Sequence, residues 1–198
     1  MQNTTPDLAA LIGSRICHDL ISPIGAINNG LELLGMAGNA GGPEIGLISE
    51  SVENASARIR FFRLAFGAAS PQEVPTGEVR SIIKDMTRGS KLHVDWTVEG
   101  GAVRSDVRLA LLAEQCLDTA MPYGGDITIS RDVNGWSIRG VAEKFIVDND
   151  LWSILATGTM PQQVLPAHVQ FALLAVHSRD EGRKLRTDIR NDEILIRF

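Results

Sequence analysis

The chain of 198 residues has little of what several common protein classes require. Its only two cysteines, Cys17 and Cys116, are far apart, so neither a disulfide framework nor a zinc site is expected, and both should be small buried residues. No apolar run is long enough to span a bilayer, and residues 1–7 lack the basic and then apolar pattern of a signal peptide. We therefore expect a cytoplasmic protein.

Positive charge is also scarce. Lysine and arginine number 19 against 24 acidic residues, the net charge is −5, and there is no dense basic run. This argues against a nucleic-acid backbone or an anionic membrane as the main partner. The apolar content of 44% and the charged content of 22% are those of an ordinary globular protein, without internal repeats or low-complexity tracts.

Residues 6–69 show the pattern of two amphipathic helices joined by a turn. Four glycines and one proline in residues 35–43 predict the turn, and so an antiparallel hairpin over residues 1–70. The apolar stripe of the first helix, in steps of three and four, comprises Leu8, Ile12, Ile16, Leu20, Ile24, Ile27, Leu31 and Leu34. The stripe of the second comprises Ile45, Ile48, Val52, Ala55, Ile59, Phe62 and Phe66.

A single hairpin cannot bury two such stripes by itself. Two copies can bury them as a four-helix bundle with twofold symmetry. The alternative is that the second half of the chain covers them. The length and regularity of both stripes favour the homodimer.

Pro71 and Pro75 separate the hairpin from a half with a mixed pattern over residues 71–198. Strands mixed with helices predict a small α/β sandwich with helices on one sheet face, so the fold class is α+β. The expected strands are 92–98, 127–129, 136–141, 185–189 and 193–198. The expected helices are 77–88, one capped by Ser105 or Asp106 and ending near Ala120, and 167–177, with an irregular stretch between 142 and 166.

Among four histidines, His18 stands out. His93 is expected on the polar, solvent-facing side of a strand. His168 and His177 have neither a helical ligand spacing nor a carboxylate cluster, so no metal site is expected there. At about 100° per residue, His18 lies nearly opposite the apolar stripe and points away from the bundle. The same outer face contains Arg15, Ser22, Gly25 and Asn29, and continues to Leu33 and Met36.

The string His18-Asp19-Leu20-Ile21-Ser22-Pro23 distinguishes His18 from an ordinary exposed histidine. Pro23 cannot donate to the carbonyl of Asp19, so the helix should bend there. The string resembles the H-box of sensor histidine kinases, in which a His–acid pair precedes Thr-Pro or Asn-Pro on a dimerising helical hairpin. Ser22 replaces that Thr or Asn. The longer stretch 17–34 resembles more closely the alphaproteobacterial histidine phosphotransferases of the ChpT type.

This resemblance covers essentially the whole chain and implies that its second half is a degenerate kinase ATP-binding domain. Gln115 and Thr119 stand where such kinases carry two asparagines, the second of which holds Mg²⁺. The Asp-x-Gly-x-Gly loop is replaced by residues 142–145, and the later glycine-rich loop by residues 165–168. Without those glycines the backbone cannot approach a nucleotide phosphate, so no cofactor is expected on this chain.

The resemblance further implies a phosphorelay protein that moves a phosphoryl group between receiver-domain aspartates through His18. The receivers would belong to a hybrid histidine kinase and to response regulators, and would supply the aspartate and Mg²⁺. Asp19 should either orient the imidazole or point to solvent. Arg15 and Ser22 are candidate phosphoryl contacts. The partner-binding candidates are Gly25, Asn29, Leu33 and Met36.

Two alternatives stay open. One is a divergent ATP-dependent sensor kinase core, which a nucleotide-binding assay would identify. The other is a non-catalytic dimeric adaptor, which labelling of His18 would identify. The intact string at His18 favours the phosphoryl carrier over the adaptor.

Overall fold

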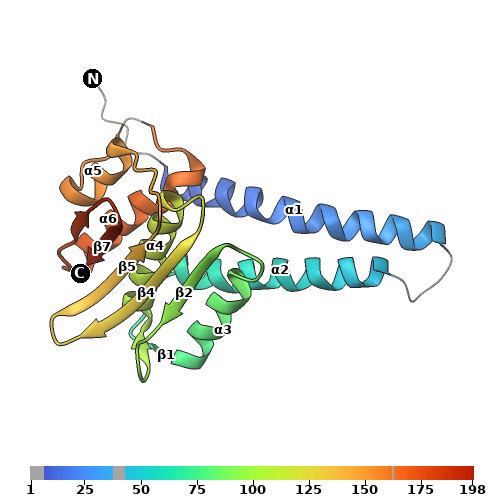
Figure 1. Ribbon diagram of the computed structural model, residues 1–198, viewed down its shortest axis with the longest axis horizontal. Helices are drawn as coiled ribbons and strands as arrows, with labels where there is room; N and C mark the ends of the chain where they lie inside the picture. Colours follow the sequence, from blue (N-terminus) through green and yellow to red (C-terminus); the bar gives the residue numbers. More distant parts are fainter. Residues whose placement is uncertain (1–6, 38–42, 162) are drawn as a thin grey trace.

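The computed structural model describes residues 7–37, 43–161 and 163–198, and the side chains of Met36 and Ala37 lie outside the described part. Two long helices, α1 (Leu8–Ala37) and α2 (Pro43–Ala65), form an antiparallel hairpin that projects from the rest of the molecule (Figure 1). Of the predicted turn 35–43, residues 35–37 still belong to α1, Pro43 begins α2, and residues 38–42 lie outside the described residues. A Cβ atom at Gly30 would lie 2.6 Å from Cγ1 of Ile48, so glycine permits the close approach of the two helices.

The second half has the predicted α+β fold, with a five-stranded sheet of order β2-β4-β5-β7-β6. The β2–β4 pair is parallel and the other pairs are antiparallel. In chain order these strands are β2 (Leu92–Trp96), β4 (Gly125–Asp132), β5 (Gly135–Val141), β6 (Arg186–Ile189) and β7 (Glu193–Arg197). Two short strands, β1 (Glu73–Val74) and β3 (Ala102–Val103), pair separately.

Helices cover one face of the sheet. The buried α4 (Arg104–Ala120) contacts β4 and β5, and α6 (Val169–Asp180) lies beside α4 (Figure 1). The short turn η1 (Pro166–His168) leads into α6, and α3 (Thr76–Met86) packs against α2. None of the helices in the described ranges is long and apolar enough to cross a membrane.

Two local predictions are wrong. The stretch 142–166 contains a helix, α5 (Asn149–Thr157), whose start is capped by the Asp148 carboxylate accepting from the amides of Asp150 and Leu151. Neither Ser105 nor Asp106 caps α4, which begins at Arg104. The carboxylate of Asp106 instead accepts a bond from Trp136 Nε1 at 3.2 Å and so joins α4 to the sheet.

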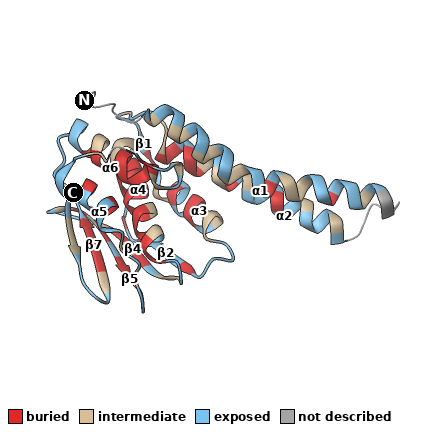
Figure 2. Ribbon diagram, turned by 90° about the horizontal axis from the view of Figure 1, so that it is seen from above, coloured by how far each residue is buried: buried red, intermediate tan, exposed pale blue. Residues whose placement is uncertain are grey.

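The second half of the chain covers the apolar stripes of the hairpin only near its base. There Phe61, Phe62 and Leu64 are buried in the core of the second half, and Leu8, Ile12, Ile16 and Leu20 pack against that core. The alternative that the second half covers the stripes is therefore right for the base. Farther out the hairpin surface is mostly exposed (Figure 2). Five stripe residues are 41–55% exposed: Ile24, Leu31, Ile45, Val52 and Ile59.

Candidate phosphotransfer site

The imidazole of His18 lies on the outer face of α1, where its side chain is 83% exposed. Ser22, Asn29 and Leu33 on the same face are exposed, and Gly25 is half-buried. Among the described residues, nothing lies within 4 Å of a Cβ atom built at Gly25, so the surface about two turns after His18 is open. Met36 belongs to α1, but its side chain is outside the described part.

The pattern analysis missed two features of this surface. Ile21, three residues after His18, is 69% exposed, although apolar residues on a helix are usually assigned to the core. Cys17 is also exposed, so the prediction of two buried cysteines is wrong for Cys17 and right for Cys116. Cys17 lies about 100° around the helix from His18, away from the side that faces α2.

Asp19 does not point to solvent. Its side chain is only 11% exposed, and its Oδ1 lies 3.0 Å from Nδ1 of His18. A carboxylate accepts hydrogen bonds but cannot donate them, so Nδ1 carries the hydrogen in this contact. In the neutral ring, the lone pair is then on Nε2. This geometry favours the orienting role for Asp19.

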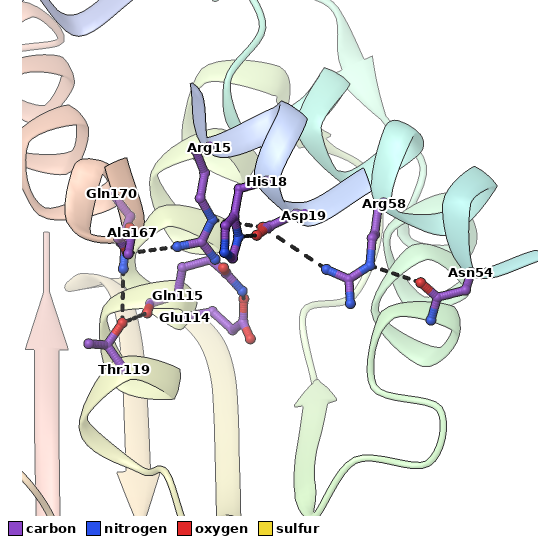
Figure 3. A network of polar contacts seen from close by, with 10 residues as sticks. All are labelled: Arg15, His18, Asp19, Asn54, Arg58, Glu114, Gln115, Thr119, Ala167 and Gln170. Carbon is purple, nitrogen blue, oxygen red and sulfur yellow. Dashed lines mark hydrogen bonds and ion pairs between the residues drawn. The ribbon is translucent and has the colours of Figure 1, made fainter. Parts of the chain in front are cut away.

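Two arginines lie at the other oxygen of Asp19 (Figure 3). Arg15 Nε is 2.7 Å from Asp19 Oδ2, and Arg15 Nη1 donates to the backbone carbonyl of Ala167 at 2.6 Å. Arg58 of α2 has Nη1 4.0 Å from the same oxygen and donates through Nε to Asn54. Arg58 and Ala167 are distant from His18 in sequence, and no spacing rule indicated either.

A crevice of about 140 Å³ lies beneath these residues, between α1, α2, α3 and α4. Glu114 on its wall is buried, and burial raises the pKa of its carboxyl to about 8, with a smaller contribution from the charge of Asp118. Partial burial also raises the pKa of Asp118, and the positive charge of Arg15 opposes that shift. The raised pKa favours the uncharged form of the Glu114 carboxyl, which accepts a hydrogen bond from Gln115.

Comparisons with known proteins assign a family to the chain. A family model described as the histidine phosphotransferase C-terminal domain matches residues 76–193, more than half of the chain. Protein phosphotransferase ChpT of Brucella abortus (strain 2308) is 34% identical over 206 residues, covering 96% of this chain and 93% of that protein. The chain belongs to the histidine phosphotransferase family.

A solved structure of a bacterial phosphotransferase shares the fold of this histidine phosphotransferase. Its TM-score is 0.79 at 30% identity, and the match covers 99% of this chain and 98% of that one. The match extends over both the hairpin and the α+β half. The arrangement of the two halves is therefore that of a known phosphotransferase.

The two residues that replace the kinase asparagines are bonded within the histidine phosphotransferase itself. The hydroxyl of Thr119 donates to the backbone carbonyl of Gln115 at 2.9 Å and accepts from Nε2 of buried Gln170 at 2.8 Å. The amide of Gln115 donates to Glu114 at 3.1 Å (Figure 3). Polar groups at the positions expected to face a nucleotide thus form internal contacts, and the bond between Thr119 and Gln170 joins α4 to α6.

Stability of this histidine phosphotransferase should fall as pH rises through the titration of Glu114. Its pKa is raised from 4.5 to about 8 in the folded chain, so between these values the folded state binds more protons than the unfolded state. We expect Glu114→Gln to match the wild type at pH 5 and to exceed its free energy of unfolding at pH 9 by up to a few kcal/mol, at about 1.4 kcal/mol per pKa unit. Urea unfolding at both pH values measures this, with exposed Glu143→Gln as the control. If the free energy of unfolding of Glu114→Gln depends on pH in the same way as that of the wild type, the pKa of Glu114 is not raised in the folded chain.

Proposed function

We propose that this chain carries a phosphoryl group on His18 between receiver-domain aspartates in a phosphorelay. The strongest support is the exposed imidazole whose Nδ1 is bonded to Asp19 at 3.0 Å, since this leaves Nε2 as a nucleophile toward solvent. Membership of the histidine phosphotransferase family supports the same role. A location in the cytoplasm stays a prediction from the sequence.

In the proposed reaction, Nε2 of His18 attacks phosphorus in line as the bond between phosphorus and the receiver's aspartate oxygen breaks. The aspartate leaves as a carboxylate, and the ring becomes a phosphorylated imidazolium whose Nδ1–H remains bonded to Asp19. The return step to a second receiver reverses these bond changes. Because phosphoryl transfer has a loose transition state, positioning and charge provide most of the catalysis. We expect the receiver to supply Mg²⁺ and this chain to bind no cofactor.

We favour a carrier over an ATP-dependent kinase because of the residues that occupy the degenerate nucleotide region. Gln115 and Thr119 replace the asparagines and bond within the chain, and no glycine loop follows Val141. We favour a carrier over an inert adaptor because the histidine and its acidic partner are both in place.

We further propose a homodimer in which two hairpins form a four-helix bundle. Ile24 and Leu31 on α1, and Ile45, Val52 and Ile59 on α2, are exposed and repeat every seven residues. A seven-residue repeat is typical of helices that pack along a shared seam. Helical geometry places both sets on one side of the hairpin, opposite the side where Asp19 meets Arg58. We assign a second copy of the chain as the partner at this seam, because a twofold dimer packs the same surface of both copies against each other.

The proposed function is tested by incubating the chain with a receiver domain phosphorylated on its aspartate. We expect phosphate that is labile in acid and stable in base to appear on the chain, and then to move to a second, unphosphorylated receiver. An unphosphorylated donor receiver is the control. Absence of transfer from every receiver of the same cell would contradict the proposal.

Leu33 should contribute to receiver docking. It is 49% exposed and lies about 22 Å along α1 from His18, at 1.5 Å per residue, within reach of a domain centred on the histidine. We expect Leu33→Asp to leave the melting temperature nearly unchanged and to lower phosphotransfer efficiency about tenfold, or about 1.4 kcal/mol. Val133→Asp, in the fully exposed turn after β4, is the matched control. Early melting or wild-type transfer by Leu33→Asp would remove Leu33 from the docking surface.

A further inference from the structure

Three consecutive contacts join the reacting imidazole to the α+β half (Figure 3). Nδ1 of His18 lies 3.0 Å from Oδ1 of Asp19, Oδ2 of Asp19 lies 2.7 Å from Nε of Arg15, and Nη1 of Arg15 donates to the carbonyl of Ala167 at 2.6 Å. The first three residues belong to α1, and Ala167 belongs to η1. The connection therefore passes from a solvent-exposed ring to the backbone of the other half of the chain.

The Ala167 end of this connection is well anchored. The turn η1 is closed by the amide of His168, which donates to the carbonyl of Leu165 at 2.9 Å. The residues that follow, Val169, Gln170 and Phe171, are buried, and Gln170 is bonded to Thr119 of α4. Ala167 itself is exposed, but the buried residues that follow it tie its carbonyl to the packed core, so this carbonyl can fix the direction of the guanidinium of Arg15.

Arg15 is placed to act on Asp19 rather than on an incoming phosphoryl group. Its side chain is 19% exposed, whereas that of His18 is 83% exposed, and two of its N–H groups are already bonded. Its planar guanidinium can serve two acceptors at a fixed angle, which a lysine ammonium on a flexible stem cannot do. Arg58 gives Asp19 weaker support, since its nearest nitrogen is 4.0 Å away and its Nε is bonded to Asn54.

We propose that Arg15 is a positioning residue for phosphotransfer. It holds the Asp19 carboxylate against the anchored carbonyl of Ala167, and Asp19 in turn keeps His18 in the Nδ1–H tautomer with Nε2 toward the receiver. The α+β half, with its nucleotide positions replaced, then supplies the fixed point from which the histidine is oriented. This inference rests on the proposed function of His18 as the phosphoryl acceptor.

The first test reads the tautomer of His18 without any phosphate. In protein labelled with ¹⁵N-histidine, long-range proton–nitrogen spectra above the titration range of imidazole should show Nδ1 protonated in the wild type. Arg15→Met should shift His18 toward the Nε2–H tautomer that a free histidine side chain prefers. Arg15→Lys can pair with Asp19 without bridging to Ala167, so its fraction of the Nδ1–H tautomer should lie between those of the wild type and Arg15→Met. Arg190→Met, at an exposed ion pair between β6 and β7, is the charge-matched control and should match the wild type.

The second test separates positioning from direct phosphoryl contact by a double-mutant cycle. Arg15→Met should slow phosphate uptake about tenfold or more in the wild type, as expected when a histidine loses its orienting support. In an Asp19→Asn background the same change should have less than about a twofold effect, because Arg15 acts through Asp19. Thermal melting confirms that each variant is folded.

The outcomes distinguish this inference from the proposed function. If Arg15→Met leaves the His18 tautomer unchanged, or slows transfer equally in both backgrounds, Arg15 is not a positioning residue, and the role of His18 is unaffected. If the wild type accepts no phosphate, the proposed function fails, and the tautomer measurement still decides whether Arg15 orients the ring.

Discussion

Replacement of His18 by alanine should abolish phosphate uptake while leaving the fold intact. The side chain is exposed and lies away from the side of α1 that packs against α2, so the free energy of unfolding should change by less than about 0.5 kcal/mol. Without the imidazole, no other described group on this face has both a free lone pair and an orienting carboxylate. Transfer from a phosphorylated receiver, read on denaturing gels, measures the effect.

The matched control for His18→Ala is His93→Ala, which removes an exposed histidine of β2 and should transfer phosphate at the wild-type rate. Label that persists on His18→Ala would place the phosphoryl group on another residue. Loss of label together with early melting would show that the histidine is structural.

The second large effect is expected at the exposed seam of the hairpin. Ile59 is 55% exposed in one chain, so Ile59→Asp costs little in the isolated fold. In the proposed dimer the same carboxylate would be buried against the partner without a counter-charge, at a cost of several kcal/mol. Light scattering should therefore change from dimer to monomer, with melting of the α+β half preserved.

Ile189→Asp, at a similarly exposed isoleucine of edge strand β6, is the control and should remain dimeric. Phe62 lies on the same predicted stripe, but Phe62→Asp would not test the dimer alone. Phe62 is buried in the core of its own chain, so the change would also destabilise the monomer fold. A wild-type protein that is monomeric at tens of micromolar, or a dimeric Ile59→Asp, would contradict the bundle.

The sequence predicted the main elements because their periodicities are strong. Apolar residues at helical spacing gave both hairpin helices, and alternation around Leu92–Trp96 gave the first strand of the sheet. The sequence pattern did not predict α5, because a helix of nine residues has too few turns to show a clear apolar periodicity. The prediction of one continuous stripe on each hairpin helix was too simple: Ile16 packs against the second half, whereas Ile24 and Leu31 face outward.

The site was predictable only where its residues are neighbours in sequence. His18 and Asp19 follow from one string, and their contact is local. The roles of Arg58 and the Ala167 carbonyl depend on how α2 and η1 pack beside α1, and a backbone carbonyl leaves no side-chain signal at all. Arg15 could be named from its helix face, and its spacing of four residues from Asp19 is that of a helical ion pair, but its bond to Ala167 could not be predicted.

The central claim is that one phosphoryl group is carried by His18, and its most direct test is to locate that group in the wild-type protein. The chain would be phosphorylated by a receiver domain, kept at alkaline pH, and examined by peptide mass mapping together with ³¹P spectroscopy. We predict a single phosphate on the peptide that contains His18, bonded to Nε2, because Nδ1 is bonded to Asp19. Phosphate on any other residue, or on Nδ1 of His18, would contradict the account.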